Sequence, residues 1–126
     1  MKKHLIIKFE SLNQADLLAK STHIVGSLRN NPYFPAPWPV QVPTLEEVEY
    51  LVHEYGRTYQ AALNGDRLKI AERNAVSQPM IEKLKKIAHY LEVVADGNEA
   101  ALISTGYDLS HEPVRTKANP EPDATA

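Results

Sequence analysis

The chain has 126 residues, a net charge of −2 and no cysteine. A domain of this length can bury a substantial core, and the absence of cysteine excludes disulfide scaffolds, thiolate zinc sites and thiol catalysis. The nearly neutral charge gives no indication of a nucleic-acid or anionic membrane partner.

No apolar stretch approaches the about 20 residues that a membrane-spanning helix needs. The first apolar run ends at Ile7, which is too short for a signal peptide. We therefore expect a soluble chain without a membrane span. The sequence does not define a compartment, and the cytoplasm is the default expectation.

After an extended segment, the first helix is expected to begin near Ser11 and to end at Asn30. Ser11 with Gln14 forms a capping box, and Asn13 with Asp16 is the alternative start. Apolar and small residues recur at helical spacing and predict one buried stripe, formed by Leu17, Leu18, Ser21, Ile24, Val25 and Leu28.

An extended crossover, residues 32–43, follows the first helix. It holds five prolines and three aromatic residues within twelve positions. Proline fixes φ and lacks an N–H donor, so the segment fits neither a helix interior nor a central strand. Pro32 and Pro35 also match a PxxP ligand pattern, but packing of the aromatic rings across the bundle is preferred. Trp38 is predicted to be mostly buried.

The second helix begins at Thr44, where Thr44 and Glu47 form a capping box. Asn64-Gly65 provides a left-handed stop, so a hairpin to the third helix is expected, although one long helix through Gly65 is not excluded.

The third helix is expected from about Asp66 to Ala95. Pro79 interrupts it and predicts a kink, and the polar side chains of Asn74 and Ser77 are expected to satisfy the carbonyl that Pro79 frees. A short fourth helix covers residues 99–105.

These patterns predict an all-α fold, a bundle of three main helices plus a short fourth, with an extended Pro/aromatic crossover and a mobile C-terminal tail. The helical domain comprises residues 1–109. Residues 110–126 contain three prolines, several charges and almost no bulky apolar group. Such a segment cannot offset its ordering entropy, so we expect a flexible tail that serves as a contact arm.

Several short motifs occur in a fixed order, namely Leu12-x-x-Ala15-Asp16, Asn31-Pro32-Tyr33-Phe34-Pro35, Asn64-Gly65-Asp66-Arg67, Ala71-x-Arg73-Asn74-Ala75, Ala95-Asp96-Gly97-Asn98 and Ser104-Thr105-Gly106-Tyr107. Together they resemble a poorly characterised group of small bacterial helical modules that often precede a fibronectin type III domain. The resemblance implies a helical module and transfers no reaction, cofactor or catalytic residue. No fibronectin domain follows within this sequence.

The motifs that carry chemistry are missing. No serine lies in a Gly-x-Ser-x-Gly elbow, and acidic neighbours offset the small basic run at Lys83–Lys86. We predict no catalytic residue, no cofactor and no metal site. Neither a di-iron nor a zinc-protease spacing is found around the five histidines, which are His4, His23, His53, His89 and His111.

The preferred function is a non-enzymatic interaction or structural module, a subunit of a homo-oligomer or of a larger bacterial or phage assembly. The candidate contact residues are Tyr33, Phe34, Trp38 and Tyr107. A protein partner or self-association is expected, nucleic acid is not, and a small-molecule ligand is not defined.

The alternative is a small-molecule-binding or enzymatic bundle that uses tyrosine and histidine groups. A single pocket shared by Tyr55, Tyr59, His53 and His89 would favour it. A third, weaker hypothesis is a nucleic-acid-associated regulator acting through Lys83–Lys86.

Overall fold

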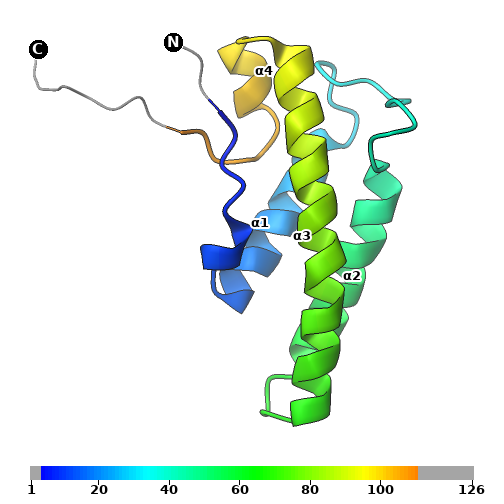
Figure 1. The fold of residues 1–126 in the computed structure, drawn as a ribbon, viewed down its shortest axis with the longest axis vertical. Coiled ribbons are helices and arrows are strands. Elements are labelled where there is room, and N and C mark those ends of the chain that lie inside the picture. Colours follow the sequence, from blue (N-terminus) through cyan, green and yellow to red (C-terminus); the bar gives the residue numbers. More distant parts are fainter. Residues whose placement is uncertain (1–3, 111–126) are drawn as a thin grey trace, which may run out of the picture.

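The computed structural model describes residues 4–110 and has the predicted all-α fold (Figure 1). The described elements are a 3-10 turn, η1 (Phe9–Ser11), and the helices α1 (Gln14–Leu28), α2 (Leu45–Ala61), α3 (Arg67–Ala95) and α4 (Glu99–Ile103). The prediction of three main helices and a short fourth is therefore confirmed. Apart from Ser110, the predicted tail lies outside the described residues. No helix in the described part is both long enough and apolar enough to cross a membrane.

Local capping chemistry fixes where the helices begin. Asn13, not Ser11, caps α1, because its side chain accepts the Asp16 N–H at 2.8 Å while the Ser11 hydroxyl donates to the Lys8 carbonyl. The predicted capping box of Thr44 and Glu47 is present at the start of α2.

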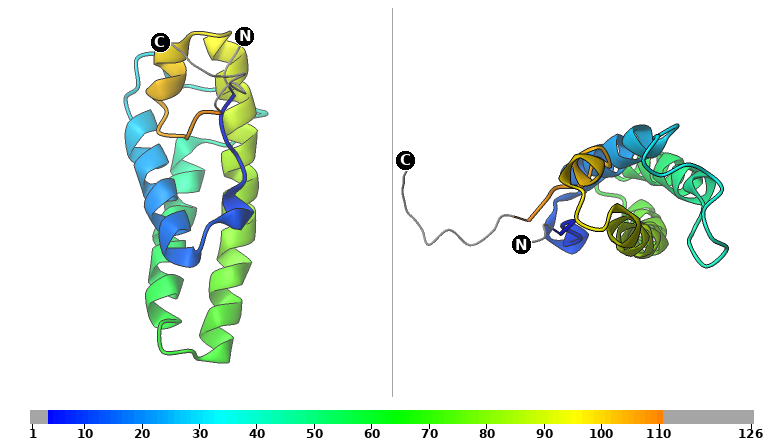
Figure 2. Two further views of the ribbon diagram at one scale, coloured as in Figure 1. Left: turned by 90° about the vertical axis from the view of Figure 1, so that its left-hand side faces the viewer. Right: turned by 90° about the horizontal axis from the view of Figure 1, so that it is seen from above.

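The long helices α2 and α3 form an antiparallel hairpin, and α1 packs over only part of its length (Figures 1 and 2). Gly65 adopts a φ of +85° in the connecting turn, which confirms the hairpin and excludes one continuous helix. α4 and the N-terminal segment, residues 4–8, lie toward the opposite end of the hairpin from this turn.

The two ends of the described chain are tied together beside α3. Leu5 and Leu109 form an antiparallel bridge, and the Ile6 N–H donates to the Asp108 carbonyl at 2.8 Å. The Leu5 N–H donates to the Glu92 carboxylate of α3 at 2.6 Å. These bonds hold residues near both ends of the described chain against each other and against α3.

α3 continues without interruption through Pro79. The prediction that Asn74 and Ser77 hydrogen-bond the carbonyl left without a donor by Pro79 is wrong. The Ser77 hydroxyl instead donates to the Asn74 carbonyl at 3.0 Å, and the Asn74 amide oxygen accepts from Arg73. The freed carbonyl belongs to Ala75, which lies on an exposed stretch where water can satisfy it.

Candidate functional site

The crossover between α1 and α2 is anchored by a buried asparagine. The Asn31 amide donates to the Ser27 carbonyl at the end of α1 and to the carbonyl and hydroxyl oxygens of Ser104 beyond α4, at 3.0–3.1 Å. Its amide oxygen accepts the Tyr33 N–H at 2.9 Å. These bonds join three segments. The Phe34 N–H donates to the Asn31 carbonyl at 3.1 Å, and the Phe34 side chain lies in the core, where it is 2% exposed.

Trp38 packs across the crossover onto α3. Its indole N–H donates to the Phe34 carbonyl at 3.0 Å, and its ring centroid lies 5.8 Å from that of Tyr90. The side chain is partly buried, less than the sequence predicts, because it also lines a pocket.

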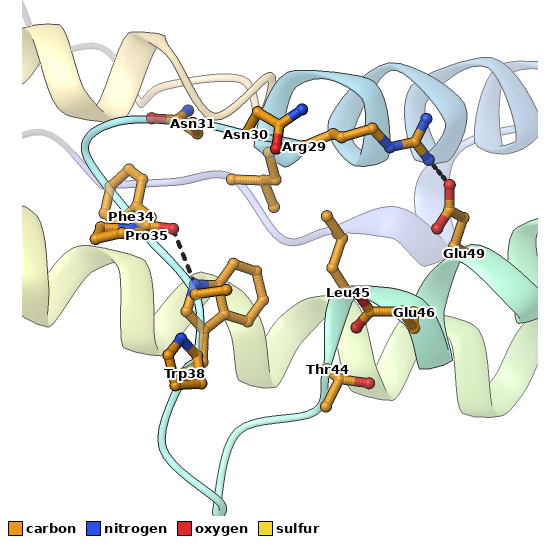
Figure 3. Close-up of a pocket in the computed structure, with 13 residues that line it drawn as sticks. Arg29, Asn30, Asn31, Phe34, Pro35, Trp38, Thr44, Leu45, Glu46 and Glu49 are labelled. Atoms are coloured by element: carbon orange, nitrogen blue, oxygen red, sulfur yellow. Dashed lines mark hydrogen bonds and ion pairs between the residues drawn. The ribbon is translucent and has the colours of Figure 1, made fainter.

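This crossover pocket has a volume of about 420 Å³ and lies between the end of α1, the crossover and the beginning of α2 (Figure 3). Its size is within the range of ligand pockets, about 300–1,000 Å³. The walls are mainly apolar and include Leu28, Phe34, Trp38, Leu45 and three residues of the proline-rich segment, Pro35, Ala36 and Pro37.

The polar residues of the crossover pocket come from the two helix ends. Arg29 and Glu49 form an ion pair that links α1 to α2 along one edge (Figure 3). Both side chains are partly exposed, so the pair contributes little to stability, and its main effect is to position the edge. Asn30 and Glu46 also line the pocket.

The structure separates the four predicted contact residues. Tyr33 is 44% exposed and Trp38 lines the crossover pocket. Phe34 and Tyr107 are core residues, and of the two only Phe34 reaches the wall of the crossover pocket. The Tyr107 hydroxyl donates to the Leu84 carbonyl at 2.6 Å, and burial raises the pKa of Tyr107.

The tyrosine and histidine groups do not meet in the crossover pocket. Tyr55 is fully buried, burial raises its pKa, and its hydroxyl donates to Gln14. Tyr59 packs on the Tyr55 ring, while His53 and His89 are exposed on α2 and α3. None of these four residues lines the pocket.

The remaining chemical groups are also dispersed. A second, shallow pocket of about 320 Å³ lies on α1 and includes His23 and Lys20. Among residues 4–110, no three His, Asp or Glu side chains are grouped so that they could hold a metal ion. Lys83 and Lys85 of the basic run pair with Glu47 and Glu10.

The sequence analysis missed Arg29, Asn30, Glu46 and Glu49, although a signal for this region exists. Residues 30–45 form a run of sixteen positions without Asp, Glu, Lys, Arg or His, and no other such run in the chain exceeds eight. The pocket lies along this run. Of its charged residues, Arg29 and Glu46 bound the run on either side, and Glu49 lies three positions further along α2.

Comparison of the chain with protein-family models, with curated proteins and with solved structures found no match. The likeness to helical modules that precede fibronectin domains therefore stays a prediction.

Proposed function

We propose that the chain is a non-enzymatic protein-interaction module, a subunit of a homo-oligomer or of a larger assembly. Its contact surface is the crossover face, which we define as the crossover pocket together with Tyr33, Val40 and Tyr50.

The observation that carries this proposal is the gathering of apolar groups along the uncharged run. Val40 is 96% exposed and Tyr33 is 44% exposed, and both lie in the segment that forms the pocket wall. Tyr50, 65% exposed, lies one helical turn beyond Glu46 of the pocket rim. Protein interfaces are depleted of charged residues at their centre and enriched in aromatic side chains, which is the composition of this face.

The test compares two variants of the full chain in association. Tyr33→Ser with Tyr50→Ser removes two exposed rings from the crossover face. Val93→Ser removes an apolar side chain, 77% exposed, from the last turn of α3, outside the crossover pocket. All three side chains are exposed, so we expect melting temperatures close to that of the unchanged protein.

We expect the double variant to lose self-association in light scattering, or capture of a protein from a lysate of the source organism, while Val93→Ser retains both. If the unchanged protein stays at the monomer mass of 14.1 kDa and captures nothing, the proposal is wrong. It is equally wrong if the double variant associates as the unchanged protein does.

A further inference from the structure

We propose that the occupant of the crossover pocket is the crossover turn of a second copy of this chain, with Val40 of each copy entering the pocket of the other. This inference rests on the proposed function and names the partner. It follows from the shape of the turn, from the composition of the face and from the symmetry of dimers.

The turn that carries Val40 is a preformed protrusion. The Val42 N–H donates to the Pro39 carbonyl at 2.9 Å, which closes a turn with Val40 at its tip. Prolines at positions 37, 39 and 43 restrict the backbone on both sides. In the right-hand view of Figure 2 this part of the crossover projects beyond the helices. A rigid protrusion loses little conformational entropy when it binds.

The pocket beside the turn suits an aliphatic side chain. Leu28, Trp38 and Leu45 line it, and its volume of about 420 Å³ leaves room for Val40 and its immediate neighbours. Burial of a valine in such surroundings is favourable, because the apolar area leaves water.

A two-fold symmetric interface must be complementary to itself, since the same patch occurs on both copies. The crossover supplies both an apolar protrusion at Val40 and, two to five residues earlier, part of the wall of an apolar hollow, so one segment of each copy carries both halves of such a contact. Residues 30–45 carry no charge, so face-to-face packing buries no unpaired ion. Arg29 and Glu46, which bound the run, and the nearby Glu49 would form the polar rim.

In the part of the chain that the structure describes, two other clusters of exposed apolar side chains lack a pocket beside them. Leu63 and Leu68 flank the hairpin turn, and Val93 and Ile103 lie on α3 and α4. None of these four residues lines either of the two pockets described above. Among the described residues, the crossover thus offers both halves of a self-complementary contact.

The first measurement is the dimer dissociation constant of the full chain by sedimentation velocity. Val40→Ser is expected to weaken the dimer on the order of 100-fold, because each dimer loses two buried valines. Val93→Ser, the matched control, should leave the constant unchanged. Both positions are exposed, so both variants are expected to fold.

The second measurement uses the absence of cysteine in the chain. Val40→Cys in one preparation and Thr44→Cys in an isotope-labelled preparation place single thiols on the turn and on the pocket rim. On oxidation, a labelled–unlabelled disulfide should dominate this mixture. Val40→Cys mixed with labelled Leu63→Cys should give far less of it.

The outcomes separate this inference from the proposed function. A chain that is monomeric at every concentration but captures another protein through the crossover face overturns the second-copy partner and leaves the interaction module intact. A dimer that survives Val40→Ser and is lost with Leu63→Ser and Leu68→Ser overturns both, because the contact then lies at the hairpin turn.

Discussion

Gly106 ends the α4 region with a φ of +84°, and a Cβ built there would lie 2.8 Å from Ser27 Oγ and 3.1 Å from Ile24 Cα. The backbone beyond α4 therefore contacts α1 directly, at a distance at which a Cβ atom would force its neighbours to shift. Gly65 has nearly the same φ, +85°, but a Cβ there meets nothing within 4 Å. A side chain at position 65 would therefore cost only the strain of the left-handed backbone. At position 106 it would cost this strain and a steric clash as well.

We expect Gly106→Ala to lower the free energy of unfolding by about 2 to 4 kcal/mol, the sum of left-handed strain and a steric clash. Gly65→Ala, which adds the strain alone, should cost about 1 kcal/mol. Denaturant unfolding monitored by circular dichroism measures both. Equal losses in the two variants would mean that the contact with α1 does not constrain position 106.

Single residues also show where sequence reasoning ends. The pattern of residues 32–43 marks Phe34 and Trp38 as ring-packing candidates, and it cannot say which ring enters the core. The crossover is held in place in part by the bonds of Asn31 to Ser104, 73 positions away, which local sequence patterns do not reveal. The burial of Tyr107 also depends on distant residues. Its hydroxyl donates to the carbonyl of Leu84 on α3, a contact between segments 23 positions apart that no local pattern predicts.

Helix boundaries were predictable because caps are local. The capping box at α2 and the Asn64-Gly65 stop need only neighbouring residues, and both appear as expected. The start of α1 was ambiguous because two caps lie two residues apart, and η1 uses the Ser11 hydroxyl before the helix begins. The pocket was not predictable from any one element, since three segments form it.

The α2 cap predicts a response to acid. The pKa of Glu47 is lowered from its ordinary value of 4.5, first by the Thr44 backbone N–H and then by Lys83. Because the folded pKa is the lower one, the carboxylate stabilises the fold above pH 4.5. That contribution is lost as the pH falls through the folded pKa.

Glu47→Gln should therefore lower the melting temperature near neutral pH and should flatten the decline of that temperature below about pH 5. Glu46→Gln is the control, because Glu46 lies one position earlier and takes no part in the capping box. Calorimetric scans from neutral pH to about pH 3 measure both. A decline in Glu47→Gln as steep as in the unchanged protein would contradict the assignment.

At the scale of the whole molecule, α3 is supported unevenly along its length. With 29 residues it is about 44 Å long. α4 and the N-terminal segment pack on the half of α3 that contains its C-terminus, while α1 packs mainly against α2 (Figures 1 and 2). Met80, Leu84, Ile87 and Leu91 are completely buried there. In residues 67–76, by contrast, no side chain is fully buried.

This asymmetry predicts a gradient of local stability. Amide protons of residues 67–76 should exchange with solvent markedly faster than those of residues 80–91, because the former can open without exposing the core. Hydrogen exchange followed by mass spectrometry, at a concentration where the chain is monomeric, measures the difference. Equal protection along α3 in the monomer would contradict the prediction. Protection of residues 67–76 that appears only at high concentration would have a different meaning. It would place the contact between copies at the hairpin turn, beside the exposed Leu63 and Leu68, because a second copy would then cover this end of α3.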